Sequence, residues 1–342
     1  MKTQRNRFRE HKKYKDGLLK SKEELEQLHR ENGRDKIYYV LSFGAGSQSS
    51  HLLEEHINGK VHYDYIIFSD TGAEPEFIHR QVLWWQARMK AKGCKTPFIT
   101  TCHNSMEGGL EEMLLRYIWT NYQRFQMPLY FNKRTETGEI VKGGLMPRQC
   151  TGDFKIVPVQ QAARRQIKKE LGLGERQQIP RNIGIIMDIG FSEDEVKRVG
   201  GYVSHQSKYI YLAYPLIEWA LNTQDSLNWL AENGFPERRS RCYFCPFNCD
   251  YKDIGMDWCE IIEYEPLSFL KACWFDEELR LIQATGKKNM QSIPYFHHTR
   301  TPLKDVYESD YSRLIQGDLK WKLFGWIAEW KQKFKVKYGV VV

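Results

Sequence analysis

A glycine- and serine-rich stretch, Gly44-Ala-Gly46-Ser47-Gln48-Ser49, is the first set of residues whose types and spacing suit chemistry. Backbone N–H groups and hydroxyls that gather in such a loop at the start of a helix can bind an anion such as phosphate. The stretch is not a Walker A loop, because no Gly-Lys-Ser/Thr ends it, and it lacks the third glycine of the dinucleotide-binding turn. Taken alone, it indicates either an anion site or a simple connection between two elements.

A group of cysteines in the last third of the chain is the second such set. Cys242 and Cys245 are separated by two residues, and Cys249 follows after three more. Cysteines this close together in a reducing compartment usually bind a metal, hold an iron–sulfur cluster or do redox chemistry. The chain has 8 cysteines in 342 residues, too few for a disulfide scaffold. Four of the others are predicted to be small buried hydrophobic side chains: Cys94, Cys102, Cys259 and Cys273.

Alternating strands and helices are predicted to position the glycine–serine loop. Apolar runs at 36–43, 65–69 and 97–101 predict buried strands, and the stretches that follow the first two are typical of helices. This rhythm predicts an α/β fold with a doubly wound, mostly parallel sheet, in which ligands bind beyond the carboxyl ends of the strands. The loops that begin at Gly44 and Asp70 are therefore expected at one edge of the sheet.

Three parts are expected along the chain. Residues 1–35 form a basic arm and a short helix that begins with a capping box. Residues 36–212 form the α/β domain, with a further strand at 182–187 and an insertion at 105–147 over the loop edge of the sheet. Residues 213–342 form a helix-rich region that carries the cysteine group.

Charge is unevenly distributed along the sequence. The chain carries 51 Lys and Arg against 43 Asp and Glu, a formal net charge of +8 at pH 7. Residues 1–15 alone carry a net +6, so this basic arm either reaches for phosphate groups or stays solvated.

Apolar residues make up 41%, a globular composition that excludes collagen-like and fully disordered chains. With neither an apolar run of 18 residues nor an apolar signal segment, a cytoplasmic protein without a membrane-spanning helix is expected.

The motifs, in their order along the chain, resemble those of the PP-loop ATP pyrophosphatases, specifically the phosphoadenosine-phosphosulfate (PAPS) reductase branch. The first two are Ser42-Phe-Gly-Ala-Gly-Ser-Gln-Ser49 after one strand and Asp70-Thr71-Gly72-x-x-Pro75 after the next. Further stretches that resemble this branch are Arg148–Pro158, Gly190–Arg198, Tyr214–Trp219 with Cys242–Pro246, and His297–Leu303. The resemblance spans residues 37–305 and is strongest to the PAPS-reductase-like proteins often found in phages and prophages.

The resemblance implies a site for ATP and Mg²⁺. In this family the loop holds phosphate, other residues lie near the nucleotide, and cations bind the leaving or terminal phosphate where negative charge develops. An acidic pair would bind Mg²⁺ or substrate, or would only stabilise the start of a helix. The loop residues that would hold phosphate are Ser42, Gly44, Gly46, Ser47, Gln48 and Ser49, and those near the nucleotide are Asp70, Thr71, Gly72 and Arg148. The cations for the leaving or terminal phosphate are Lys155 and Arg198, and the acidic pair is Asp194 and Glu195.

The same resemblance implies a [4Fe–4S] cluster on the cysteines. Adenosine-phosphosulfate (APS) reductases hold such a cluster with two cysteine pairs; Cys150, Cys242 and Cys245 stand at matching places, whereas Thr151 replaces the fourth. Three thiolates would leave one iron open to carry hydrosulfide, which resembles cluster-dependent tRNA and DNA thiolation enzymes. With Cys249 as a fourth ligand the site would be closed, and structural Zn²⁺ could equally occupy it.

Two departures from the family pattern decide the expected activity. No cysteine follows Cys273, so the C-terminal nucleophile of a true PAPS reductase is missing, and Gln48 stands where the family loop has an aspartate. The sequence therefore predicts an enzyme that cleaves ATP to AMP and pyrophosphate, adenylates an acceptor and transfers sulfur to it. Basic stretches at 1–15, 164–169 and 238–241 favour a nucleic acid as the acceptor. A sulfur donor is the other expected partner, and homodimer formation is left open.

Two alternatives stay open at this point. One is a sulfonucleotide reductase that acts on PAPS or APS with an external thiol as reductant. The other is a zinc-stabilised nucleic-acid-binding protein that keeps the fold without turnover, a reading that Gln48 supports best. Pyrophosphate release separates the adenylating enzyme from both alternatives, and sulfite formation identifies the reductase.

Overall fold

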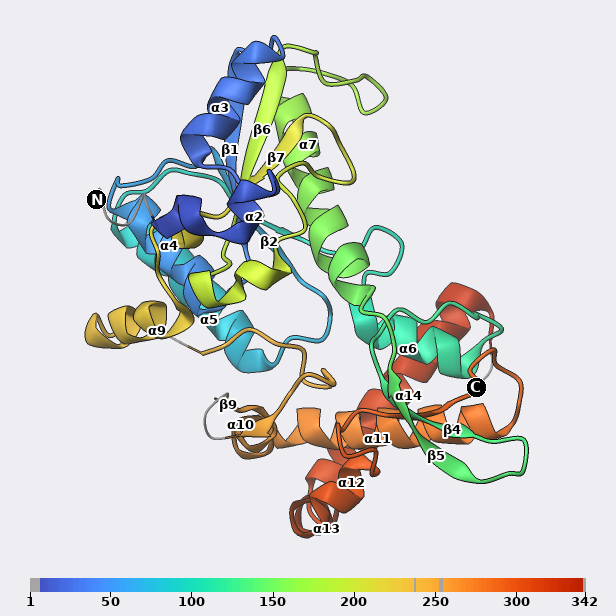
Figure 1. The fold of residues 1–342 in the computed structure, drawn as a ribbon. Helices are drawn as coiled ribbons and strands as arrows, with labels where there is room; N and C mark the ends of the chain where they lie inside the picture. The colour runs from blue at the N-terminus through green and yellow to red at the C-terminus, as the bar shows by residue number, and fades with distance from the viewer. Residues whose placement is uncertain (1–6, 237, 252–254, 341–342) are drawn as a thin grey trace. The chain divides into compact units, whose positions relative to one another are not determined.

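The computed structural model describes residues 7–236, 238–251 and 255–340, which fold into two compact units (Figure 1). Both units are assembled from separate stretches of the chain. Unit 1 consists of Met1–Asp70, Ile78–Thr101 and Lys155–Ser240, and unit 2 consists of Thr71–Phe77, Cys102–Phe154 and Arg241–Val342. The units are therefore interleaved in the sequence, and the chain passes from one to the other five times.

Unit 1 is built on a five-stranded sheet in which every neighbouring pair of strands is parallel. The strands, in spatial order, are β3 (Phe98–Thr101), β2 (Tyr65–Ser69), β1 (Lys36–Phe43), β6 (Ile183–Ile189) and β7 (Ile210–Ala213). From β1 the chain first moves outward to β3 and later continues on the other side with β6 and β7, so the strand order reverses between β1 and β6. The predicted α/β class with a parallel sheet is confirmed.

Helices surround this sheet. In chain order they are α2 (Lys12–Lys15), α3 (Lys22–Glu31), α4 (Ser47–Ile57), α5 (Glu76–Ala91, in unit 1 from Ile78), α7 (Val157–Glu170), the 3₁₀ helix η2 (Glu193–Arg198), α8 (Pro215–Glu218) and α9 (Thr223–Glu232). The predicted capping box is present at α3, where Ser21 accepts a hydrogen bond from the Glu24 N–H and Glu24 accepts one from the Ser21 N–H. The helix beginning there is thus specified locally.

Both faces of the sheet are covered because its central strands are apolar on both sides. β2 is buried at all five positions and β6 at six of seven. Ile185 of β6 packs in a cluster with Val159 of α7, whereas the next residue, Ile186, packs with Leu25 of α3. Since successive side chains of a strand point to opposite faces, α7 and α3 lie on opposite sides of the sheet (Figure 1).

His29 joins α3 to β6. Its buried ring stacks on Tyr211 at 3.9 Å, Arg34 lies 3.3 Å from its Nδ1, and its Nε2 lies 3.2 Å from the carbonyl oxygen of Ile185. A Cβ at Gly184 would lie 2.5 Å from Nδ1 of His29, so this strand position requires glycine. Burial lowers the pKa of His29 to about 4. The imidazole is therefore neutral at pH 7.

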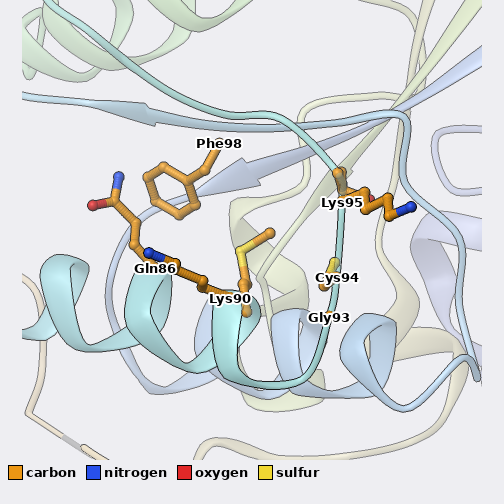
Figure 2. Close-up of a pocket in the computed structure, with 8 residues that line it drawn as sticks. Gln86, Lys90, Gly93, Cys94, Lys95 and Phe98 are labelled. Atoms are coloured by element: carbon orange, nitrogen blue, oxygen red, sulfur yellow. The ribbon is translucent and has the colours of Figure 1, made fainter.

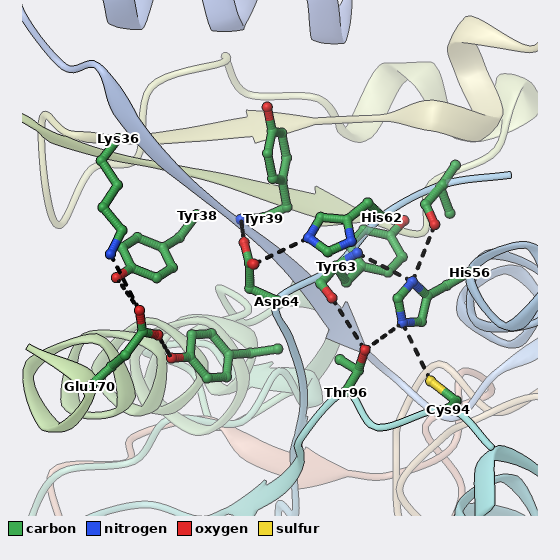
Figure 3. Close-up of polar contacts among 12 residues, drawn as sticks. Lys36, Tyr38, Tyr39, His56, His62, Tyr63, Asp64, Cys94, Thr96 and Glu170 are labelled. Atoms are coloured by element: carbon green, nitrogen blue, oxygen red, sulfur yellow. Dashed lines mark hydrogen bonds and ion pairs between the residues drawn. The ribbon is translucent and has the colours of Figure 1, made fainter. Parts of the chain in front are cut away.

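Glu170, at the end of α7, ties this helix to the amino ends of two strands (Figure 3). Its carboxylate accepts hydrogen bonds from the hydroxyls of Tyr38 (2.7 Å) and Tyr65 (2.5 Å), and Lys36 lies 3.3 Å away. The hydrogen bonds from Tyr65 and Tyr38 lower the pKa of Glu170, because they stabilise its charged form. The network fixes the edge of the sheet that lies away from the glycine–serine loop.

Unit 2 is mainly helical and packs around a core rich in aromatic side chains, among them Trp258, Phe275 and Phe296. The predicted insertion contains α6 (Gly109–Trp119) and a hairpin that pairs with β10 in a three-stranded sheet. The elements besides α6 are β4 (Tyr130–Arg134), β5 (Ile140–Leu145), the π-helical turn η1 (Gly152–Ile156, in unit 2 up to Phe154), β8 (Asp250–Tyr251), β9 (Gly255–Met256), α10 (Asp257–Tyr264), α11 (Pro266–Ala284), β10 (Ile293–Tyr295), α12 (Leu303–Val306), α13 (Glu308–Ile315) and α14 (Leu319–Tyr338). Within the described residues, no helix combines the length and the apolar character needed to cross a membrane.

Candidate phosphate-binding loop and cysteine segment

The glycine–serine loop follows β1, which ends at Phe43, and includes the first turn of α4, which begins at Ser47. β1 is also the strand beside which the order of the sheet reverses. In parallel sheets a crevice forms outside the carboxyl ends of the strands at such a reversal, because the connections leave in opposite directions. The loop thus lies at the position where ligands generally bind in sheets of this kind.

The loop is held in a turn by hydrogen bonds to its backbone. Ala45 has a left-handed backbone with φ of +55°, a conformation that costs a non-glycine residue on the order of 1 kcal/mol. Gln81 of α5 offsets this cost, since its amide donates a 2.5 Å hydrogen bond to the Ala45 carbonyl. The Gly44 N–H donates to Ser49 Oγ, and that hydroxyl donates to the Gly46 carbonyl, both at 3.1 Å. The first turn of α4 therefore begins on a preformed loop.

A second loop, which follows β6, contacts the first turn of α4. A Cβ added at Gly190 would lie 3.0 Å from the backbone nitrogen of Ser49 and 3.3 Å from its Cα. Only glycine lets the two backbones approach this closely without a shift. The loops on either side of the strand reversal are thus packed against each other, and η2 follows the second one directly.

Gln48 joins the two loops through Glu195 of η2. Its amide nitrogen lies 3.3 Å from a carboxylate oxygen of Glu195 and 3.3 Å from the hydroxyl of Thr223. An aspartate at this position would place a second negative charge beside that carboxylate. Glutamine suits the position because an amide can donate a hydrogen bond where a carboxylate would be repelled.

Arg198 and Asp194 have different surroundings on η2. Arg198 forms an ion pair with Glu195, and its guanidinium lies 4.2 Å from the centre of the Phe191 ring. Its side chain is 44% exposed, so it can still reach an anion. Asp194 instead accepts hydrogen bonds from the N–H (2.9 Å) and the hydroxyl (2.7 Å) of Thr223. Partial burial opposes the shift, yet these hydrogen bonds lower the pKa of Asp194.

The other predicted site residues of unit 1 lie at the ends of elements. Ser42 is the second-last residue of β1, and Asp70 follows β2 with its N–H donating to the Thr101 carbonyl at 2.8 Å. Lys155 is half-buried in the turn that leads into α7. Sequence reasoning missed Gln81 and Thr223, because no local pattern marks a side chain that acts only through contacts distant in the sequence.

The described part of the basic arm packs on the segment of η2. Phe8 is buried with Val199, and Lys13 donates a 2.8 Å hydrogen bond to the Val199 carbonyl. Arg7 forms a 2.6 Å ion pair with Glu193. These two cations are therefore bound within unit 1 and support the loop after β6. The prediction that the arm reaches for phosphate falls partly outside the described residues, since Lys2 and Arg5 precede residue 7.

Thr71 and Gly72, predicted to lie near the nucleotide, belong to unit 2. The N–H and hydroxyl of Thr71 donate to Glu74 at 2.9 and 2.6 Å, and its side chain is buried. Gly72 has φ of +67°, and a Cβ there would lie 2.5 Å from the Gly108 carbonyl oxygen. Gly109, with φ of +60°, makes the reciprocal approach to the Thr71 carbonyl. This segment is therefore a close contact between two backbones.

The cysteine group also lies in unit 2. The Cys245 N–H donates to the Cys242 carbonyl at 3.0 Å, so these two residues share one tight turn, and Cys242 Sγ lies 3.5 Å from Thr71 Oγ1. The Cys249 thiol lies 3.6 Å from a carboxylate oxygen of Asp257. Cys150 and Cys242 are partly buried against the core of unit 2. Arg148, from the same segment as Cys150, places its guanidinium 5.2 Å from the centre of the Phe247 ring.

The cysteine side chains of the described residues do not converge on one point. Among the described side chains, no group of three or more His, Cys, Asp or Glu could hold one metal ion. The set Cys150, Cys242, Cys245 and Cys249 stays a prediction from resemblance. Of the cysteines predicted to be buried, Cys273 is buried, whereas Cys94, Cys102 and Cys259 are only partly so.

An open cavity of about 470 Å³ lies elsewhere on unit 1, where the end of α5 meets the start of β3 (Figure 2). Cys94 lines it, and its sulfur lies 3.6 Å from Nε2 of His56, which is 2.8 Å from the Thr96 hydroxyl (Figure 3). Burial lowers the pKa of His56. The cavity is at the amino end of β3, so it is separate from the glycine–serine loop. Its lining residues are Gln86, Met89, Lys90, Gly93, Cys94, Lys95, Thr96 and Phe98.

No protein-family model matches this chain, and no curated protein matches it. The motifs are therefore the sole ground for the family resemblance.

Proposed function

We propose that this protein is a PP-loop-type enzyme that binds ATP at the glycine–serine loop, releases pyrophosphate and adenylates an acceptor. The supporting observation is the packing of two loops at the strand reversal of unit 1. The loop Gly44–Ser49 supplies backbone N–H groups at the start of α4, and the loop after Gly190 brings Glu195 and Arg198 beside it. The start of a helix binds anions, and the long side chain of Arg198 next to it carries a positive charge, so the arrangement suits a polyphosphate.

The first chemical step uses side chains of unit 1. A nucleophilic oxygen of the acceptor attacks the α-phosphorus of ATP, and the bond from this phosphorus to the bridging oxygen of the β-phosphate breaks. Pyrophosphate leaves with the bonding electron pair, so negative charge grows on its oxygens. Arg198 and Lys155 are the proposed cations for this charge, because catalysis of phosphoryl and nucleotidyl transfer is mainly positioning and electrostatic stabilisation.

Glu195 is the proposed protein ligand for Mg²⁺. Magnesium in nucleotide sites is commonly bound by one or two carboxylates together with phosphate oxygens, so one suitably placed carboxylate is enough. Glu195 contacts Gln48 of the loop through one oxygen and pairs with Arg198 through the other, whereas Asp194 contacts Thr223 at the start of α9. We therefore assign Asp194 to anchoring the start of α9.

The second step transfers sulfur to the adenylated acceptor. Hydrosulfide from an external donor attacks the carbon that carries the adenylated oxygen, and AMP leaves with that oxygen. One sulfur atom thus replaces one oxygen atom without any net redox change. A nucleic-acid base with an oxo group is the proposed acceptor.

Pyrophosphate release tests this proposal. The purified protein is incubated with ATP, Mg²⁺ and single-stranded nucleic acid, and pyrophosphate is measured with the Arg198→Gln variant alongside. Arg313→Gln is a matched control, because Arg313 also pairs with an acidic residue three positions before it and is likewise exposed. We expect a loss of 10²-fold or more for Arg198→Gln, of the order seen when one transition-state donor is removed, and none for the control. Equal rates for both variants, or sulfite release from PAPS in place of pyrophosphate from ATP, would overturn the proposal.

A further inference from the structure

The last helix of the chain, α14, has two faces of different character. One face is docked in unit 2: Leu323, Trp330 and Phe334 are buried, and the Trp330 indole N–H donates a 3.1 Å hydrogen bond to Glu111. Near the end of the helix, Lys337 forms a 2.8 Å ion pair with Glu112. The helix is therefore fixed in orientation, and its opposite face points to solvent.

The solvent face carries aromatic rings and lysines together. Trp321 is 71% exposed and Phe324 45%, and their rings meet edge to face with centres 6.1 Å apart. Lys331 and Lys335 are exposed about two to four turns further along. At 3.6 residues per turn these four side chains share one side of the helix, beside the buried stripe, over a length of about 20 Å. We call this set, Trp321, Phe324, Lys331 and Lys335, the aromatic–basic face.

Charge on α14 is almost entirely positive. The helix contains six lysines and a single acidic residue, Glu329. Lys337 is paired with Glu112, and Lys333 lies over the Trp330 ring at 4.8 Å. The lysines of the aromatic–basic face complement a chain of negative charges.

A membrane surface fits this face less well than a nucleic acid does. A helix that lies in a bilayer needs a continuous apolar face to insert. The continuous apolar stripe of α14 is the one that is already buried in unit 2. On the exposed side, two aromatic rings are followed by lysines, an arrangement in which flat rings stack with bases while cations contact phosphates.

We propose that the aromatic–basic face of α14 binds single-stranded nucleic acid, with Trp321 and Phe324 stacking on unpaired bases and Lys331 and Lys335 contacting the backbone. The inference deepens the proposed function, since it names the class of acceptor and where it is held. Single strands are specified because a ring can stack on a base only when the base is not enclosed in a duplex.

Binding of a fluorescent 20-nucleotide single strand, measured by anisotropy without ATP, tests the inference. Loss of one stacked base costs about 1–3 kcal/mol, so we expect Trp321→Ala to weaken binding about 5- to 150-fold. Val336→Ala, which removes an exposed apolar side chain from the same helix without removing a ring, is expected to bind like the unaltered protein. Lys331→Gln with Lys335→Gln is expected to reduce the slope of log affinity against log salt by about 1.4, because each single-strand phosphate contact contributes about 0.7.

Several results would overturn the inference. They are unchanged single-strand binding by Trp321→Ala, equal or tighter binding of a duplex of the same sequence, and binding only to phosphatidylserine vesicles. Circular dichroism of each variant shows that α14 still folds. Pyrophosphate release from ATP is measured on the same samples. If the unaltered protein binds the strand but releases no pyrophosphate, the proposed function alone is refuted. If it releases pyrophosphate but does not bind the strand, this inference alone is refuted.

Discussion

Gly190→Ala is the sharpest test of the two-loop packing at the strand reversal. The added Cβ would lie 3.0 Å from the Ser49 nitrogen, 3.3 Å from its Cα and 3.4 Å from the Gln48 carbonyl carbon. The nearest approach is about 0.5 Å shorter than the optimum for non-bonded atoms, and all three neighbours are backbone atoms that cannot rotate away. Relief requires that one loop move. Overpacking of this kind costs about 1–3 kcal/mol of unfolding free energy.

Gly200→Ala is the matched control for this substitution. Gly200 lies just after η2, has no left-handed backbone, and a Cβ there meets nothing within 4 Å. It isolates the general effect of replacing glycine by alanine, which stabilises by about 0.4–1 kcal/mol through the unfolded state. Urea denaturation gives the two free energies, and calorimetric titration with ATP gives the affinity. We expect Gly190→Ala alone to lose stability and to bind ATP more weakly. If both variants are equally stable and bind ATP equally, the loops are not packed as described.

Three further predictions concern protonation and access. His29→Gln should flatten the pH dependence of the free energy of unfolding. The neutral buried imidazole contributes fully to this free energy above pH 6.5, and the contribution, up to about 3 kcal/mol, is lost as pH falls toward 4. Urea denaturation midpoints at pH 7.5 and pH 5 measure the difference. Gln48→Glu should lower the free energy of unfolding by about 1–3 kcal/mol at pH 7.5, because it adds a negative charge beside Glu195. Near pH 4, where carboxylates become protonated, the stability of this variant should recover. A loss of stability that is independent of pH would contradict the charge argument. Because burial raises the pKa of Cys273 well above its usual range, alkylation followed by mass spectrometry should label Cys94 in the open cavity long before Cys273, and the reverse order would contradict the burial of Cys273.

Four of the five strands of unit 1 could be predicted from the sequence, whereas β7 was not. The apolar runs 36–43 and 65–69 coincide with β1 and β2, because strands covered on both faces must be apolar at nearly every position. The place of the glycine–serine loop followed from the same runs. The contact of Gly190 with Ser49 could not be predicted, since 141 positions of sequence separate them and no local propensity reports such a packing.

The cysteine segment shows the opposite case. The spacing of Cys242 and Cys245 predicts a shared ligand, yet spacing alone says nothing about which third and fourth side chains converge on it. In the structure the Cys249 thiol is directed to Asp257, a partner that no motif announces. Resemblance proposed Cys150 and Cys249 as further ligands, and only tertiary structure shows what surrounds their sulfur atoms.

The interleaving of the two units bears on how the chain is made. A ribosome synthesises the chain from its N-terminus, and Ser240 is the last residue of unit 1. By then 60 residues of unit 2, in two separate stretches, have already emerged without the helices α10, α11 and α14 that supply much of its core. Apolar side chains such as Met113 and Leu129 must therefore wait for the last hundred residues before they are covered. Stalled or truncated translation products of this chain are expected to expose them and to depend on chaperones, which pulldown of nascent chains stopped near residue 240 would detect.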